Sequence, residues 1–428
     1  MVTISKFSYE NPRFLQLLKR RSSIPEEVEI TVKEVLKNVK SNGDEALYAY
    51  MKKFDHVDMK EIGLFVTEEE FANAREKVSE EFKEAVKVAC DNIIQFHRRQ
   101  VPTSYREPYA NGVVLERKYT PLTSVAVTVP GDQAPLISSL YMNLIPALVA
   151  GVPNIYVLTK PRLDGTIDEH LLYVADYLKV KNYYKISGSQ GIAAVAYGTD
   201  RVKKVDAITG PGNNYTQMAK KMLFGEVRID SIAGPSEIAI IADEKANPTY
   251  IAADMMSQAE HGTGFEASTT FCLSDELAIK IKEEIIRLAE ENHLVTATKK
   301  TFDNYGDIFV VDTLKEAVDA VNEIAPEHVE VLLENSEEVI HSLTNVGAVF
   351  VGEYSTEPVG DYFCGTNHIL PTCGTARFSS GMSVQDFMRG HSIIRYTEEA
   401  LKCNADHITI LAEAEHMMAH ALAVKVRK

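Results

Sequence analysis

The sequence lacks several features that would assign a protein class directly. Its five cysteines are an odd number and form no C-x-x-C pair, which argues against a disulfide framework and against a cysteine-based zinc finger. We therefore interpret them as reduced thiols. The longest apolar stretch, residues 144–158, is interrupted by Pro146, Pro153 and Asn154. It falls short of the roughly 18 to 20 uninterrupted residues that span a bilayer, so the sequence predicts no membrane helix.

Positive charge is also scarce. The 428 residues include 45 Lys and Arg against 61 Asp and Glu, for a formal net charge of −16, which is too acidic for a general nucleic-acid binder. The opening residues, MVTISKFSYENPRF, have no basic flank, apolar segment or small-residue cleavage site, so nothing in them directs export. We expect a cytoplasmic protein. Repeats of about 20 to 50 residues and low-complexity tracts are absent too, which argues against a solenoid.

The composition is that of a globular protein, with 45% hydrophobic and 25% charged residues. Residues 24–99 carry apolar side chains at three- and four-residue spacings, which predicts helices. After Pro121, β-branched runs alternate with helical stretches, and this alternation predicts mainly parallel sheets with helices on both faces. Nine runs are many for one sheet, so we expect two α/β domains; from Ser380 the pattern is helical again. The runs are residues 125–129, 155–159, 183–187, 206–209, 238–242, 269–274, 308–312, 329–333 and 348–352.

In open parallel sheets, ligands bind beyond the carboxyl ends of the strands, so the residues after each run are the first to inspect. In GPGNNY, Gly210 and Gly212 allow the backbone to approach a ligand closely. Asn213 can cap the next helix, whose amides attract phosphate. The dinucleotide fingerprint needs a third glycine where Tyr215 stands, so the loop is either a nucleotide cradle or a plain turn. In SGSQG, Gln190 lies at the start of a predicted helix, where its side chain either caps the helix or contacts a ligand.

Three further segments offer polar side chains. Ser236 precedes a buried strand, and because no G-x-S-x-G elbow is present, its hydroxyl favours ligand contact over nucleophilic attack. In SQAEH, Gln258 and His261 are three residues apart and share one helical face, so they can offer an oxygen and an imidazole to one metal. The alternative for His261 is a partly buried residue at a helix end. In the last predicted helix, His416 and His420 are four residues apart. They either present paired imidazoles on one face or lie on a face that is exposed to solvent.

In APEH, Glu327 and His328 stand immediately before a strand. An unperturbed imidazole has a pKa of about 6.5, and a neighbouring carboxylate can raise that pKa or orient a water molecule. The pair therefore suits proton transfer near neutral pH. A solvent-facing acid and imidazole are the alternative. In GDYFCGTNHILPT, Asp361, Asn367 and His368 lie between glycines in a loop too polar for the core, which indicates a site.

These motifs follow one another over nearly the whole chain. They are PG-x-x-AP (130–135), SGSQGIAAVAYGT, GPGN, IDSIAGPSE, SQAEH, APEH, GDY-x-x-GTNH-x-LPT and E-x-x-x-AH-x-x-AV (415–424). Together they resemble the histidinol dehydrogenase family, whose members oxidise L-histidinol through the aldehyde to L-histidine while reducing two NAD, in the last step of histidine biosynthesis. The resemblance implies a four-electron, NAD-dependent alcohol dehydrogenase.

The resemblance also implies roles for particular residues. Metal ligands would be Gln258, His261, Asp361 and His420. This donor set suits Zn2+ and also Co2+ or Mn2+. By resemblance, His328 would remove the alcohol proton and Glu327 would activate water onto the aldehyde. Substrate would be contacted by these six residues together with Ser236, His368 and Glu415. NAD would be contacted by Thr128, Gln190 and Asn213.

The implied fold is α/β, with two incomplete Rossmann-like, aldehyde-dehydrogenase-like domains and helical extensions at both ends. The implied boundaries are 1–22 for an N-terminal helical extension, 23–127 with 237–378 for a discontinuous catalytic domain, 128–236 for an NAD-binding domain, and 379–428 for a helical dimerisation tail. In the family this tail reaches the other subunit. His420 and Glu415 would therefore complete the partner's site in a homodimer.

Two positions depart from the family pattern. Where the family has Tyr before V/I-PGG, this sequence reads T-V-PGD, with Thr128 and Asp132, and this leaves the choice between NAD and NADP open. The residues also leave three alternatives. These are a paralogous metal- and NAD-dependent dehydrogenase of another small polar alcohol, a metal-dependent hydrolase in which Glu327 activates water, and a non-catalytic metal-binding scaffold.

Overall fold

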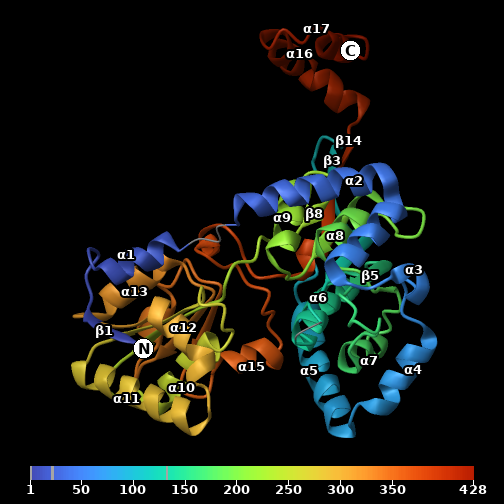
Figure 1. Ribbon diagram of the computed structural model, residues 1–428. Helices are drawn as coiled ribbons and strands as arrows, with labels where there is room; N and C mark the ends of the chain where they lie inside the picture. Colours follow the sequence, from blue (N-terminus) through green and yellow to red (C-terminus); the bar gives the residue numbers. More distant parts are fainter. Residues whose placement is uncertain (1, 21–23, 132–133) are drawn as a thin grey trace.

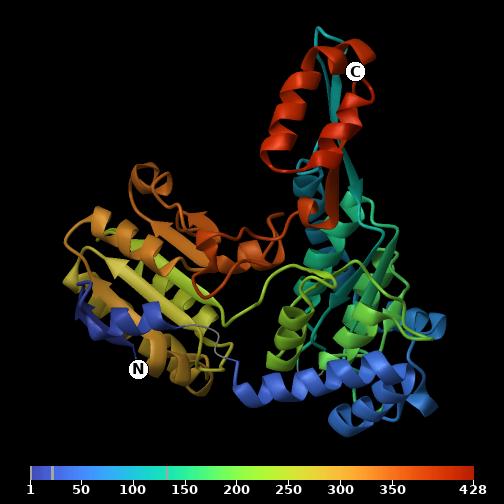
Figure 2. The same cartoon turned by 90° about the horizontal axis from the view of Figure 1, so that it is seen from above.

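The computed structural model describes residues 2–20, 24–131 and 134–428, which form a mixed α/β structure. Two α/β units lie side by side, and a narrow arm projects from one of them (Figures 1 and 2). The chain begins in one unit and ends at the tip of the arm. The predicted α/β class is confirmed. Asp132 lies outside the described residues, so its effect on cofactor choice stays a prediction.

The first unit is built on a six-stranded parallel sheet. Its strands, in spatial order, are β1 (Thr3–Lys6), β11 (Gly306–Val310), β10 (Ala267–Cys272), β9 (Glu237–Ala242), β12 (His328–Leu332) and β13 (Ala348–Val351). One face is covered by α10 (Pro248–Ala259), α11 (Asp275–Glu291) and α12 (Val295–Tyr305), and the other by α1 (Pro12–Lys19), α13 (Leu314–Ile324) and α14 (Glu337–Ile340). Because both faces are covered, β9 presents apolar residues to each, with Ile238 and Ile240 on one and Ala239 and Ile241 on the other.

The second unit is built on a five-stranded parallel sheet. Its strands, in spatial order, are β6 (Tyr183–Tyr184), β5 (Asn154–Leu158), β4 (Ser124–Thr128), β7 (Ala207–Thr209) and β8 (Arg228–Ile229). The core on one face includes α4 (Glu68–Lys77), α5 (Glu80–Arg98), α6 (Ile137–Ala150) and α7 (Glu169–Tyr177), and the core on the other includes α2 (Glu26–Tyr50), α8 (Gly188–Tyr197) and α9 (Asn214–Leu223). The chain runs outward from β4 through β5 and β6, then crosses to the other side of β4 for β7. Such a reversal creates a ligand-binding crevice at the carboxyl ends of the two strands.

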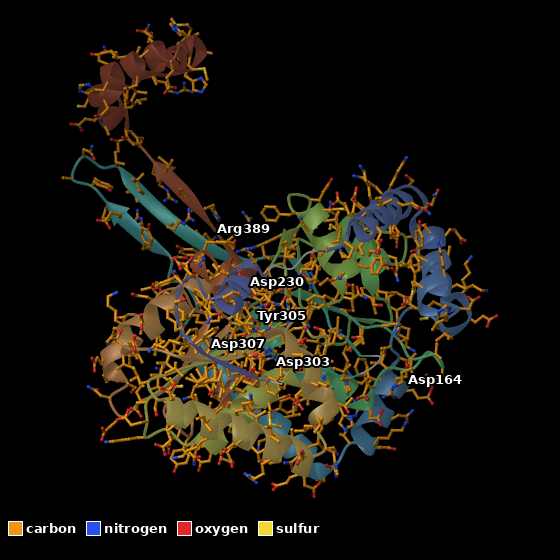
Figure 3. All side chains as sticks on the ribbon, turned by 60° about the vertical axis from the view of Figure 1, so that its left-hand side comes forward. Asp164, Asp230, Asp303, Tyr305, Asp307 and Arg389 are labelled. Carbon is orange, nitrogen blue, oxygen red and sulfur yellow. The ribbon has the colours of Figure 1, made fainter. Side chains whose placement is uncertain are left out.

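The arm combines an antiparallel ribbon with two helices. The ribbon contains β2 (Tyr105–Pro108), β3 (Val114–Pro121) and β14 (Met388–Arg395), and the helices are α16 (Glu398–Ala414) and α17 (Met418–Lys425). Both helices stand clear of the two units (Figures 1 and 3). The remaining helical segments are α3 (Met59–Ile62), α15 (Glu357–Tyr362), a π-helical turn (Met51–Asp55) and two 3-10 turns (Thr375–Arg377 and Val384–Phe387). No helix within the described ranges has both the length and the apolar character needed to cross a membrane.

All nine predicted strands are present, with ends that differ from the prediction by at most three residues. The structure differs in two segments where helix was predicted. Within residues 1–22, Thr3–Lys6 form β1, which pairs with β11. Beyond Ser380, Met388–Arg395 form β14, which pairs with β3 along its length. Most side chains of β14 are at least partly exposed, so the strand carries no apolar alternation that the sequence pattern could reveal.

The N-terminal helices belong to a different unit from the one predicted. Residues 23–127 were expected to form one domain with 237–378, but α2 packs on α8 and α9, and β4 is the central strand of the five-stranded sheet. The predicted catalytic domain is thus divided between the two sheets. Amphipathic spacing shows that a helix buries one face, but not which sheet that face covers.

His97 on α5 provides a test of how burial affects stability. Its imidazole is fully buried, with Nδ1 2.8 Å from the Ile93 carbonyl oxygen and Nε2 3.3 Å from Nδ2 of Asn367. Burial lowers the pKa of His97 and outweighs the hydrogen bond to Ile93, which raises it. In the unfolded chain the pKa of His97 is about 6.5. The stability of the fold with a neutral, buried His97 is therefore fully present above that pH and is lost as the pH falls through the lower pKa of the folded state.

We therefore expect the free energy of unfolding in urea to fall on acidification below about pH 6.5, and to fall less in His97→Gln. The glutamine amide can keep a donor toward Ile93 and an acceptor toward Asn367 without gaining a proton. If the free energy of unfolding fell equally in the two proteins between about pH 7 and about pH 5, this assignment would be contradicted.

Candidate active site

A cluster of ionisable side chains gathers at the amino ends of β9 and β12. Glu327 and His328 are 6% and 3% exposed, so the alternative of a solvent-facing pair is wrong. Parallel pairing sets His328 opposite Ile238 of β9, which follows Ser236 and Glu237 in the chain. Ligands of open sheets usually bind at the carboxyl ends of strands. This cluster lies at the edge formed by the amino ends of the strands, so inspecting the residues after each strand does not locate it.

Backbone contacts orient both members of the pair. Oε2 of Glu327 accepts a hydrogen bond from the Glu237 amide at 3.2 Å. Nδ1 of His328 lies 3.1 Å from the Glu237 carbonyl oxygen, and because a carbonyl only accepts, Nδ1 carries the proton. Nε2 is buried and has no hydrogen-bond partner in the described chain. The neutral ring would therefore present a basic nitrogen on the side away from β9.

Neighbouring carboxylates control the protonation of His328. Burial alone would lower its pKa, but Glu327, followed by Asp361 and Glu357, outweighs burial and raises the pKa to about 10. Burial also raises the pKa of Glu327 to about 8, although His328 opposes this shift. By itself the cluster therefore favours a charged imidazolium. A cation bound to these carboxylates would draw negative charge away from His328 and favour its neutral, basic form.

Two of those carboxylates come from α15, a helix where a loop was predicted. Glu357 and Asp361 are four residues apart and share one helical face. Oε1 of Glu357 is 3.5 Å from Nδ1 of His328, and Oδ1 of Asp361 is 3.7 Å from Nε2. One ligand atom from each of these three residues lies within 4.8 Å of the others. Sequence reasoning missed Glu357, although its position one helical turn before Asp361, with a proline between them, is a detectable signal.

Gln258 supplies an unsatisfied polar group immediately after Ser257, whose hydroxyl donates to Glu357. It lies in the last turn of α10, is fully buried, and neither Oε1 nor Nε2 has a partner among the described residues. Leaving such a group unpaired costs about 1 to 3 kcal/mol. The orphaned carboxamide, together with the convergent carboxylate and imidazole donors, therefore fits a bound metal ion or a polar ligand.

His261 is near the cluster, but not on the helical face that was predicted. Helix α10 ends at Ala259, so His261 lies beyond the helix and does not share its face with Gln258. The residue is exposed. Burial acts to raise the pKa of Glu357 and of Asp361, and His261 is the smallest of the influences that oppose it. It therefore lies close enough to act with them.

The segment predicted as one polar site divides into two parts. Asn367 is buried and structural, because its Nδ2 donates to the Met142 carbonyl oxygen at 2.7 Å. His368 is half-buried, burial lowers its pKa, and Asp361 opposes that shift. Its Nε2 has no partner in the described chain, which leaves it available to a ligand near Asp361. Ser236 is half-buried immediately before β9, as predicted.

Within one chain, Glu415 and His420 are not brought to this cluster. Both are exposed at the tip of the arm, which stands away from the six-stranded sheet (Figure 1). Of the two interpretations of His416, paired imidazoles and a solvated face, the structure agrees with solvation, because His416 is exposed and does not share a helix with His420. Helix α16 ends at Ala414, His416 has a φ of 60°, and α17 begins at Met418.

A second candidate site is a cavity of about 380 Å³ at the carboxyl edge of the five-stranded sheet. Its walls include the residues that follow four of the strands, and the predicted residues Thr128, Gln190 and Asn213 are among them. Gln190 is buried and donates to Asp55 Oδ2 at 3.0 Å, so it is no helix cap. Asn213 does cap α9, accepting from the amides of Tyr215 and Thr216 at 3.1 Å.

The loop that follows β7 is held rigidly at this cavity. Gly210 has a φ of 103°, and a Cβ there would lie 2.2 Å from the Thr128 carbonyl oxygen, so only glycine fits. The Gly210 amide donates to Asp230 Oδ2 at 2.7 Å, and its carbonyl accepts from Lys220 Nζ at 2.9 Å. Lys220 and Asp230 also form a buried ion pair at 2.5 Å. The sequence motif showed the glycine but not the pair that holds it.

Comparison with known proteins identifies the family. Residues 18–428 match the family model of histidinol dehydrogenase. The chain belongs to the histidinol dehydrogenase family. The histidinol dehydrogenase of Clostridium acetobutylicum is 44% identical over 422 residues, covering 98% of this chain and 97% of the relative. That of Geobacillus kaustophilus is 45% identical over 402 residues, covering 94% of each.

A solved structure agrees with these relatives. The crystal structure of histidinol dehydrogenase from Elizabethkingia anophelis superposes with a TM-score of 0.93 at 33% identity, covering 100% of this chain and 98% of that one. The resemblance inferred from the motifs is therefore confirmed, and with it the α/β fold. As a member of the histidinol dehydrogenase family, the chain is an enzyme of the oxidoreductase class.

Proposed function

We propose that this enzyme oxidises L-histidinol through L-histidinaldehyde to L-histidine, with NAD as the electron acceptor. The family supports the substrate, and one structural observation supports the site. This observation is the buried, unpaired Gln258 carboxamide, which follows Ser257, a hydrogen-bond donor to Glu357, together with the cluster of His328, Glu357 and Asp361. A polar group without a partner, next to a buried imidazole and carboxylates, suits a ligand that has both cationic and hydrogen-bonding groups.

The donors of the cluster also suit a divalent cation. Gln258, His261 and Asp361 would hold it from one chain and His420 from the partner subunit, a set of amide oxygen, carboxylate and imidazoles acceptable to Zn2+ and also to Mn2+ or Co2+. When bound, the cation supplies a template for the amine and imidazole of the substrate. Ser236, His368 and the partner's Glu415 would complete the substrate contacts.

His328 and Glu327 then divide the proton transfers. In the first oxidation, Nε2 of neutral His328 takes the alcohol proton as a hydride leaves the carbon. In the second, Glu327 takes a proton from the water that adds to the aldehyde, and a second hydride leaves the resulting hydrate anion, which becomes the carboxylic acid. The hydrogen bond between Nδ1 and the Glu237 carbonyl keeps the basic nitrogen turned to the substrate. The raised pKa of Glu327, about 8, is near neutrality, where general acid–base groups are most effective.

We assign the cavity lined by Thr128, Gln190 and Asn213 to NAD, which supplies the acceptor for each hydride. The cavity lies at the reversal point of a parallel sheet, and the amino end of α9 opens next to it, a combination that favours phosphate-bearing ligands. The unit built on the five-stranded sheet would then bind the cofactor, and the six-stranded sheet would carry the catalytic residues.

The arm would join two copies into a homodimer. Its helices expose several large apolar side chains to solvent in one chain, namely Ile410, Leu411, Met418, Leu422 and Val426. Exposed apolar side chains in such number are typical of a surface that another protein covers. A second copy that exchanges arms would bury them and bring His420 and Glu415 to the neighbouring cluster.

The stoichiometry of NADH tests this function. We expect two NADH for each L-histidinol consumed, because two hydrides leave the same carbon, and we expect chelation to abolish the reaction and Zn2+ to restore it. Absorbance of NADH with limiting histidinol measures the ratio. Turnover of another small alcohol but not histidinol would identify a paralogue, and turnover without nicotinamide would identify a hydrolase; either result would reject the proposal.

A further inference from the structure

Strand β12 carries a second ionisable residue on the face of His328. Residues two apart on a strand point to the same side, so Glu330 lies beside His328. It is 1% exposed. Its Oε1 accepts a hydrogen bond from the Glu357 amide at 2.9 Å. Glu330 has no part in the chemistry proposed above, and a buried glutamate in the middle of a strand needs a structural or functional reason.

Asp254 of α10 is the partner of Glu330. Each carboxyl group shifts the pKa of the other, so the two lie close together. Two adjacent buried carboxylates cannot both be charged at low cost. Burial and then Asp254 raise the pKa of Glu330 to about 9, and burial also raises the pKa of Asp254, so the two groups together retain a proton at neutral pH. Oε2 of Glu330 has no hydrogen-bond partner among the described residues.

The pair holds the beginning of α15 at two adjacent residues. Thr356 precedes this six-residue helix and makes no side-chain cap to it. Its Oγ1 donates instead to Asp254 Oδ1 at 2.5 Å. The Glu357 amide, which no residue within the helix can satisfy, donates to Glu330. The side chain of Glu357 then accepts from Ser257 Oγ at 3.0 Å and faces His328.

These contacts join β12 and α15 at two points. Strand β12 presents His328 and Glu330, and α15 presents the side chain and the amide of Glu357 to them. Asp361 follows one turn later on the same helix. A displacement of α15 would therefore move both carboxylates that face the imidazole, and misplacement by about 1 Å can cost about 100-fold in rate.

We propose that Glu330 and Asp254, through their hydrogen bonds to the Glu357 amide and the Thr356 hydroxyl, hold α15, and with it Glu357 and Asp361, in register with His328. The kinetic part of the inference rests on the proposed function. Neither residue of the pair touches the reacting atoms. A role in positioning predicts that hydrogen-bonding capacity matters at residue 330 and that negative charge there does not.

The central test compares Glu330→Gln with Glu330→Leu. The glutamine oxygen can accept from the Glu357 amide, as Oε1 of Glu330 does, and its NH2 can donate to the neighbouring Asp254 carboxylate. We expect kcat within about threefold of the unsubstituted enzyme for Glu330→Gln and a loss of about 10- to 100-fold for Glu330→Leu. The KM for NAD should be unchanged in both, because the cofactor cavity is in the other unit. A folded Glu330→Leu variant with unchanged kcat, or equal losses in both variants, would overturn the proposal.

Thr356→Val provides a second test outside the sheet, in case Glu330→Leu does not fold. It removes the Thr356 contact to Asp254 with little change in shape, and we expect about a three- to tenfold loss of kcat. Unchanged kcat would overturn the role of Asp254. The exposed Thr344→Val is the matched control and should be neutral.

A measurement without substrate separates this inference from the proposed function. Because α15 carries Asp361, we expect competition with a chelator to show weaker Zn2+ binding in Glu330→Leu and Thr356→Val, and unchanged binding in Glu330→Gln. If the unsubstituted protein binds Zn2+ but does not oxidise histidinol, the proposed function fails while these affinities still decide the positioning role. Equal affinity in all four proteins would overturn it.

Discussion

The substitution His328→Asn is expected to abolish histidinol oxidation while the bound metal is retained. Asparagine can still donate to the Glu237 carbonyl oxygen, as Nδ1 does at 3.1 Å, but it provides no base at the position of Nε2. General-base assistance is typically worth about 100- to 10,000-fold, or roughly 3 to 5 kcal/mol of barrier. Initial rates of NADH formation measure the loss, and elemental analysis of the purified variant measures the metal.

A matched control for this substitution is available on the surface. His341 is exposed and interacts only weakly with Glu337, one helical turn away, so His341→Asn should leave rate and metal content unchanged. If His328→Asn kept more than about a tenth of the activity, His328 would not be the general base. If the variant lost its metal, His328 would be a ligand, as its grouping with Glu357 and Asp361 also allows.

Gln258→Ala and His420→Ala should each remove the metal and the activity, yet a mixture of the two chains should recover activity. In a dimer with exchanged arms, one site would combine both defects and the other would combine an intact Gln258 with an intact partner His420. With random pairing we expect about one quarter of the unsubstituted activity, because about half of the dimers are mixed and each has one intact site of two.

Co-expression with two different affinity tags allows the mixed dimers to be isolated, and these should then carry one metal ion in two chains. Each homodimer purified in the same way is the control and should be inactive. Absence of any recovery in isolated mixed dimers would refute a site shared between subunits. It would require His420 to act within its own chain, where the structure keeps it at the tip of the arm (Figure 1).

Several parts of the candidate site follow from local sequence. Glu327 and His328 are adjacent in the chain, so any strand that begins at His328 brings them together. Asn213 lies in a Gly-rich turn before a helix and caps it, as predicted. Short-range patterns of this kind are reliable because the interacting groups are only a few residues apart.

Other parts of the site depend on contacts that local patterns do not encode. Glu357 is 29 positions after His328, and only the packing of α15 against β12 brings their side chains together. Gln258 and His261 have helical spacing, but α10 ends between them. Gly210 has two partners from other parts of the chain. Lys220 comes from the following helix and Asp230 from the loop after β8. None of these contacts has a fixed sequence separation.

The amino-acid sequence by itself determined the α/β class, the nine strands, the family and the adjacency of Glu327 and His328, because apolar periodicity and short motifs are local properties of the chain. The tertiary structure decided which sheet the N-terminal helices cover, that β1 and β14 are strands, and that the buried cluster forms at the amino ends of β9 and β12. It also decided that His420 lies on a projecting arm. These features depend on pairings between distant segments, which are selected by the shape and burial of the whole molecule.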